Sequence, residues 1–189
     1  MKRKIPEVLT AEEQRAFLRT FNRKAPTGLR NYAMMRLMLD AGLRCGEVLN
    51  LRTRDIDWKT GKIHIHQGKG KKDRIVWLND DALEILKQWK AIKPESDLLF
   101  TTLKGDKIND RYVRALVERK AKQAGIEKDV HPHTLRHTFA TDIYRESKNL
   151  RMVQKALGHS SIQITEIYTH IIDEELEQGM RFFRKVSVA

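Results

Sequence analysis

The stretch His131-Pro132-His133-Thr134-Leu135-Arg136-His137 carries more information than any other part of this chain. It opens a segment whose helical pattern continues to Ser147, and His133 and Arg136 in it are three positions apart. Side chains at this spacing lie on the same face of a helix. The pair is therefore predicted to reach one common target, and a guanidinium beside an imidazole suits a phosphate group.

Residue types that carry chemistry also occur on both sides of this segment. Upstream, Arg44 ends the sequence AGLR between two helical stretches, and Lys69 lies in the turn sequence GKGKKDR. Downstream, His159 lies in LGHS, and Tyr168 follows nine positions later in IYTH. Two arginines, one lysine, two histidines and one tyrosine make up the candidate set, which needs no carboxylate pair and no metal-binding cage.

Periodicity elsewhere predicts an α+β fold that is mainly helical and has one small sheet. Between Asp57 and Leu78 the pattern alternates, with turn residues at 60–61 and 68–72, which predicts two hairpins and a three-stranded antiparallel sheet. A capping box at Thr10 opens the first helix, and Gly42 stops the helix before Arg44. The predicted helices cover residues 10–23, 29–41, the stretch after 44, the stretch from a cap at 79 or 80 to before 94, 109–124, 134–147, 150–157 and 173–184.

Charge and cysteine content narrow the class of protein. The 37 Lys and Arg residues outnumber the 25 Asp and Glu residues, giving a net charge of +12. This excess favours a polyanionic partner such as nucleic acid, although a lysine-rich solvated surface gives the same balance. Cys45 is the single cysteine, and no apolar stretch is long enough for secretion or for crossing a membrane. We therefore expect a protein of the reducing cytoplasm without a membrane role.

The order and the local contexts of the six candidates resemble the tyrosine recombinases of the Xer and phage-integrase type. In chain order the six are Arg44, Lys69, His133, Arg136, His159 and Tyr168. The resemblance runs from about Thr10 to the C-terminus. It implies the tyrosine recombinase catalytic fold and an enzyme that cleaves and rejoins double-stranded DNA through a 3′-phosphotyrosyl intermediate, without a metal or another cofactor.

Three of the candidates are expected to hold the phosphate. Cleavage of a DNA phosphodiester builds negative charge on the non-bridging oxygens, and fixed cationic donors stabilise that charge. The guanidinium forks of Arg44 and Arg136 suit this task because they bind phosphate oxygens bidentately and stay charged. The resemblance adds His159 as a further hydrogen-bond donor to the phosphate.

The other three candidates are expected to move protons and form the covalent bond. Tyr168 is the nucleophile that the resemblance implies, and a phenol with an ordinary pKa of about 10 needs a general base, for which His133 is the candidate. Lys69 is the candidate general acid that protonates the leaving 5′-oxygen. Lys71 replaces it if the hairpin has a different register.

Each candidate also has an ordinary structural interpretation. An isolated arginine at a helix end most often caps the helix, and a lone tyrosine is most often a half-buried amphipathic side chain. The histidines at 131, 133 and 137, or those at 64 and 66, could form a metal site. One cysteine and the lack of a His-Glu-x-x-His pattern argue against zinc.

Further expectations concern the whole molecule and its assembly. We expect one catalytic domain over residues 1–189, without the N-terminal core-binding domain that family members usually carry. The segment after Tyr168 resembles the C-terminal helix by which such enzymes engage neighbouring protomers on DNA, as in a tetramer, and packing within its own chain is the simpler role. The apolar residues of this segment are Leu176, Met180, Phe182 and Phe183. A non-catalytic DNA-binding regulator of recombination and a type IB topoisomerase-like enzyme that relaxes DNA are the competing functions.

Overall fold

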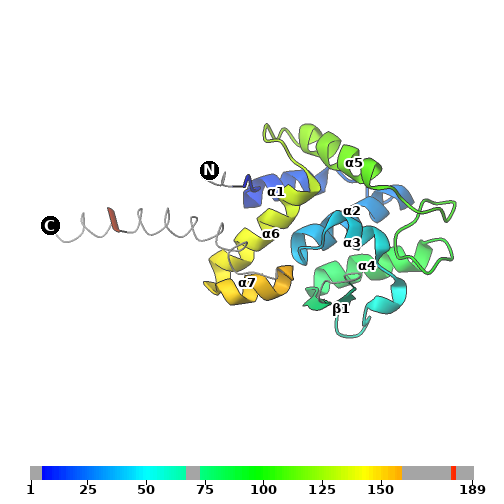
Figure 1. Cartoon of the computed structure of the whole chain (residues 1–189). Helices are drawn as coiled ribbons and strands as arrows, with labels where there is room; N and C mark the ends of the chain where they lie inside the picture. The colour runs from blue at the N-terminus through cyan, green and yellow to red at the C-terminus, as the bar shows by residue number, and fades with distance from the viewer. Residues whose placement is uncertain (1–5, 67–72, 159–179, 182–189) are drawn as a thin grey trace.

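The computed structural model describes residues 6–66, 73–158 and 180–181. This part of the chain forms seven α-helices, one 3-10 helix and a two-stranded sheet (Figure 1). The elements are α1 (Ala11–Arg19), α2 (Pro26–Asp40), α3 (Cys45–Asn50), η1 (Thr53–Asp55), β1 (Lys62–Ile65), β2 (Arg74–Trp77), α4 (Asp80–Ile92), α5 (Asp110–Gln123), α6 (Pro132–Ser147) and α7 (Leu150–Leu157). Of the helix predicted at 173–184, only Met180 and Arg181 are described and both are helical; the rest lies outside the described residues.

Helix α2 forms the centre of the core. Its side chains are buried on nearly every side, and α4 and α6 both pack against it (Figure 1). A helix that is buried all round needs partners for its polar groups. Arg30 of α2 has them, because its guanidinium donates to the carbonyl of Thr101 at 3.0 Å and to the hydroxyl of Tyr112 at 3.0 Å.

The predicted helix boundaries hold where a local signal sets them. The capping box is confirmed, since the Thr10 hydroxyl accepts from the amide of Glu13 and the Glu13 carboxylate accepts from the amide of Thr10. Asn79 caps α4 by accepting from the amide of Ala82 at 2.8 Å. Helices α2 and α6 begin earlier than predicted, at Pro26 and Pro132, because proline is well suited to the first helical turn.

Helix α1 ends at residue 19, four positions before its predicted end. Two side chains offer the local backbone another arrangement. The Thr20 hydroxyl donates to the carbonyl of Phe17 at 2.7 Å, and the Asn22 side chain accepts from the amide of Lys24 at 3.1 Å. Such short-range bonds compete with helical pairing and here replace it.

The prediction of a three-stranded sheet was wrong in strand number. Strand β1 pairs antiparallel with β2, residues 62–65 against 77–74, and the segment before them contributes one isolated bridge, Ile56 to Ile63. Asp57 explains the difference, because its carboxylate accepts from the amides of Lys59 and Thr60 at 2.9 and 3.2 Å. The chain therefore turns directly after the bridge and cannot extend it into a strand.

Candidate active site

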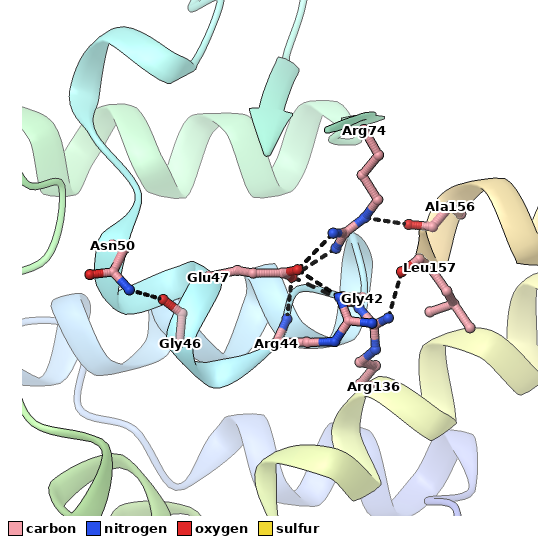
Figure 2. Close-up of polar contacts among 9 residues, drawn as sticks. All are labelled: Gly42, Arg44, Gly46, Glu47, Asn50, Arg74, Arg136, Ala156 and Leu157. Atoms are coloured by element: carbon pink, nitrogen blue, oxygen red, sulfur yellow. Dashed lines mark hydrogen bonds and ion pairs between the residues drawn. The ribbon is translucent and has the colours of Figure 1, made fainter. Parts of the chain in front are cut away.

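The guanidinium of Arg136 is bonded to two backbone carbonyls and lies close to one carboxylate. Arg136 projects from the first half of α6 and its side chain is 6% exposed. One guanidinium nitrogen, Nη1, donates to the carbonyl of Gly42, and Nη2 donates to the carbonyl of Leu157 at 2.6 Å (Figure 2). Arg136 therefore joins α6 to the end of α7 and to the loop before α3.

Gly42 is required at this loop for two reasons. Its φ of +62° lies in the left-handed region that favours glycine, and a Cβ at this position would lie 2.3 Å from the ring of Phe139. The predicted helix stop is confirmed, since α2 ends at Asp40. The turn brings the carbonyl of Gly42 to Arg136 and places Arg44 two residues further on, at the N-terminus of α3.

Glu47 joins three arginines (Figure 2). Its carboxylate accepts a bidentate pair of hydrogen bonds from Arg74, at 2.7 and 2.8 Å, and two further bonds from the amide and Nη1 of Arg44, at 2.7 and 2.8 Å. Nη1 of Arg136 lies 3.9 Å from the same carboxylate. Burial alone would raise the pKa of Glu47, but the hydrogen bonds and charge of Arg74, with the Arg44 amide and Arg136, lower it to about 2.

The charges of this cluster do not cancel. Three guanidiniums surround one carboxylate, which leaves an excess of two positive charges. Both Arg74 and Arg136 are almost completely buried, whereas the side chain of Arg44 is 35% exposed. Arg44 is therefore the arginine of the cluster that an incoming anion meets first.

Arg44 opens onto a cleft of about 900 Å³. His133 from α6, Arg114 from α5 and His64 from β1 line the same cleft. The structure thus brings Arg44 and His133 together from helices that are far apart in the sequence. With Arg136 joined to Arg44 through Glu47, three of the six predicted residues lie at one place.

The surroundings of His133 favour its neutral form. Burial lowers the pKa of His133, and the positive charges of Arg136, Arg114 and Arg44 lower it further, against an opposite effect of Asp110. A neutral imidazole has a ring nitrogen that can accept a proton. His133 therefore has the protonation state that a general base requires at neutral pH.

Cys45 lies beside Arg44 in the cleft and is not activated. Burial and a hydrogen bond with Asp110 raise the pKa of Cys45 to about 12. The thiol consequently stays protonated at neutral pH, which makes it a poor nucleophile. Within residues 6–66, 73–158 and 180–181, no group of three His, Cys, Asp or Glu side chains is arranged to hold a metal ion.

The other three predicted site residues, Lys69, His159 and Tyr168, lie outside the described residues. The three remaining tyrosines are described and serve the fold. Tyr32 and Tyr144 are buried, and the hydroxyl of Tyr112 accepts from Asn31 at 2.9 Å and from Arg30. None of these three lines the cleft that contains Arg44 and His133.

Two residues of the site, Glu47 and Arg74, were not predicted as site residues from the sequence. A local signal existed for each. Glu47 is three positions after the N-cap of α3, where an acidic side chain often bonds back to the cap amide. Arg74 occupies an inward-facing position of β2, where the alternation predicts an apolar residue, and a buried arginine needs a carboxylate partner.

Comparison with known families agrees with this geometry. Residues 7–175 match the model of the phage integrase family. The chain belongs to the phage integrase family. A tyrosine recombinase of Thermosipho africanus is 40% identical over 176 residues, which cover 93% of this chain and 61% of that protein. The tyrosine recombinase XerC of Thermodesulfovibrio yellowstonii is 37% identical over 181 residues, covering 90% of this chain and 60% of that protein.

Solved structures of recombinases share the fold of this phage integrase family member. The XerA recombinase superposes with a TM-score of 0.82 at 31% identity, covering 96% of this chain and 66% of that one. The XerH site-specific recombinase, bound to a palindromic difH substrate in a post-cleavage complex, gives a TM-score of 0.82 at 34% identity, with coverages of 96% and 54%. The predicted recombinase catalytic fold is confirmed. The chain spans about three fifths of the length of the two relatives compared above.

The described helices give no sign of a membrane span. None of them, between residues 6 and 158 or at 180–181, is both long and apolar enough to cross a bilayer.

Proposed function

We propose that this chain is the catalytic domain of a site-specific recombinase that cleaves and rejoins double-stranded DNA through a 3′-phosphotyrosyl intermediate. The observation that carries the proposal is that Arg44 and His133 line one open cleft, with the buried Arg136 joined to Arg44 through Glu47, in a member of the phage integrase family. The XerH structure, which holds a difH substrate, supports DNA as the partner.

The arginine cluster supplies the electrostatics of the reaction. Attack on phosphorus increases the negative charge of the non-bridging oxygens, and donors already in place stabilise that charge without reorganising. Arg136 is fixed by the carbonyls of Gly42 and Leu157, and Arg44 faces the cleft. The two positive charges that Glu47 leaves uncompensated match an anionic phosphate that gains further charge in the transition state.

Tyr168 is the proposed nucleophile. Its hydroxyl oxygen forms a bond to phosphorus while the bond from phosphorus to the 5′-oxygen breaks. His133 takes the phenolic proton, which its lowered pKa allows at neutral pH. The engagement of Tyr32, Tyr112 and Tyr144 in the fold supports this choice among the four tyrosines.

Lys69 is the proposed general acid, and it gives a proton to the departing 5′-oxygen. His159 is proposed to donate a hydrogen bond to the phosphate. A 5′-hydroxyl from the same or another strand then attacks the phosphotyrosine, which restores the phosphodiester and releases Tyr168. No external energy source is required, because the covalent link conserves the phosphodiester bond.

The wider setting also remains a proposal. A net charge of +12 supports contact with the DNA backbone, and phosphate contacts of this kind give affinity that falls with added salt. We further propose residues 1–189 as one catalytic domain, assembly of several copies such as a tetramer on DNA, and action in the cytoplasm. Metal and cofactor have no part in the proposed steps.

A nicked suicide substrate tests the function. Loss of a short 5′-hydroxyl fragment beside the nick prevents rejoining, so a covalent protein–DNA complex accumulates. Nicked duplexes carrying the difH site and a pool with randomised arms are incubated with the protein and resolved on a denaturing gel. We expect a protease-sensitive adduct that is lost in Tyr168→Phe and kept in the matched control Tyr144→Phe. DNA binding without any adduct would contradict the proposal and favour a non-catalytic regulator.

A further inference from the structure

Arg74 is a buried cation whose hydrogen bonds all serve the active-site framework. Its side chain is 5% exposed, and Nε donates to the carbonyl of Ala156 at 2.8 Å. Its two terminal nitrogens, Nη1 and Nη2, each donate to one oxygen of Glu47, at 2.7 and 2.8 Å (Figure 2). Burying a guanidinium is costly unless it is paired and hydrogen-bonded, and here both conditions are met.

The pairing with Arg74 limits the number of hydrogen bonds that Glu47 can accept from the other two arginines. An ionised carboxylate has about four acceptor sites, and Arg74 occupies one on each oxygen in the bidentate geometry that is strongest for this pair. Arg44 uses the remaining positions through its amide and Nη1. Arg136 stays 3.9 Å away, beyond hydrogen-bond distance, and donates instead to the carbonyls of Gly42 and Leu157.

We propose that Arg74 is a positioning residue for DNA cleavage: as the dedicated counter-ion of Glu47, it keeps the guanidiniums of Arg44 and Arg136 available to the scissile phosphate. The inference rests on the proposed function. Without Arg74, two acceptor sites of Glu47 are left open, and the carboxylate draws Arg136 from 3.9 Å into a closer ion pair. The excess of two positive charges falls to one, and the guanidinium of Arg44, which already donates one hydrogen bond to Glu47, engages the carboxylate with a second nitrogen and turns further from the cleft.

Arg74 also connects two segments that lead to other proposed catalytic residues. It is the first residue of β2 and follows Lys69 by five positions, while its acceptor Ala156 precedes His159 by three. The bond from Arg74 to Ala156 therefore ties the start of β2 to the end of α7. One side chain links the chain segments that lead to the proposed general acid and to the proposed phosphate-binding histidine.

Two substitutions at Arg74, one that removes the charge and one that keeps it, test the counter-ion role. Arg74→Gln keeps hydrogen-bonding groups without the charge, and Arg74→Lys keeps the charge without the fork. In single-turnover adduct formation we expect Arg74→Gln to be about 100-fold slower, the size of loss that misplaced catalytic groups cause. Arg74→Lys should lie between Arg74→Gln and the wild type. DNA affinity, measured by gel shift with Tyr168→Phe as the background, should change much less than the rate.

The double variant Arg74→Gln with Glu47→Gln distinguishes this role from simple loss of structure. Removing the unbalanced carboxylate should raise the rate by about tenfold over Arg74→Gln alone, since residues in one ion-pair network do not act additively. Equal or lower activity in the double variant would overturn the proposal. So would a rate in Arg74→Gln that equals the wild-type rate.

A crystal structure of Arg74→Gln tests the same idea without any activity. We expect Nη1 of Arg136 to move from 3.9 Å to hydrogen-bond distance of Glu47. An unchanged separation would contradict the counter-ion role even if the enzyme cleaves DNA. A wild-type protein that forms no adduct would instead contradict the proposed function, so the two failures are distinguishable.

Discussion

Arg44 and Arg136 are assigned the same task but have opposite surroundings. The side chain of Arg136 is 6% exposed and donates to two backbone carbonyls from different parts of the chain. The side chain of Arg44 is 35% exposed and its guanidinium is hydrogen-bonded to Glu47, three positions away. The buried arginine fixes the geometry of the site and couples it to folding. The exposed arginine presents its charge to the cleft at little cost to stability.

The largest effect on stability is expected at Arg136, the buried arginine. Arg136→Ala leaves the carbonyls of Gly42 and Leu157 without their donor and removes one cation near Glu47. We predict a loss of about 3–5 kcal/mol in the free energy of unfolding, the range for breaking buried charge pairs. Urea denaturation measures this, and adduct formation should also be lost. Stability equal to that of the wild type would show that the carbonyl contacts contribute little.

The carboxylate that connects the two arginines should make stability depend on pH. The pKa of Glu47 is lowered from 4.5 to about 2 in the folded state, so its contribution is present above pH 4.5 and is lost as the pH falls toward 2. The loss should be on the order of 3 kcal/mol, because one pKa unit corresponds to about 1.4 kcal/mol.

Urea denaturation at several pH values tests this dependence. Subtracting the pH profile of Glu47→Gln from that of the wild type isolates the contribution of Glu47. Parallel profiles for the two proteins below pH 4.5 would mean that Glu47 is not the group responsible.

Arg44→Ala should lower activity strongly while it changes stability little. A partly exposed ion pair contributes little, so we expect the free energy of unfolding to change by less than about 1 kcal/mol. Adduct formation should fall by about 100- to 1000-fold, as when one donor to a developing oxyanion is removed. Arg44→Lys is the matched control, because it keeps the charge but not the bidentate geometry. A stability loss as large as that of Arg136→Ala would remove the distinction between the two arginines.

The smallest predicted effect concerns His133 and the exposed Arg114. Burial and three arginines, including Arg114, lower the pKa of His133. Arg114→Ala removes one of these charges, so the pKa of His133 should rise and the acidic limb of the rate profile should move to higher pH. Because Arg114 is 61% exposed, salt should reduce the shift. If the acidic limb does not move at low salt, either His133 is not the general base or its pKa is not coupled to Arg114.

Local sequence signals predicted the parts of the fold that depend on neighbours in the chain. The capping box at Thr10 and the stop at Gly42 both appear in the structure. The predicted third strand failed because the Asp57 turn competes with strand pairing. The Glu47–Arg74 pair spans 27 positions, and periodicity within one element cannot indicate which distant side chains meet.

The proposed site was predictable only in part from the residues themselves. The spacing of His133 and Arg136 fixed their shared helix, but their meeting with Arg44 depends on how α2, α3 and α6 pack. The assignments of Lys69, His159 and Tyr168 came from a resemblance in local sequence. They stay predictions, because they lie outside the described residues.

Tandem mass spectrometry of the trapped protein–DNA adduct, after nuclease and protease digestion, is the most direct test. We predict a nucleotide remnant on the peptide that contains Tyr168, and none on the peptides that contain Tyr32, Tyr112 or Tyr144. A remnant on any other residue, or DNA-bound protein that carries no remnant at all, would contradict the assignment of Tyr168 as the nucleophile.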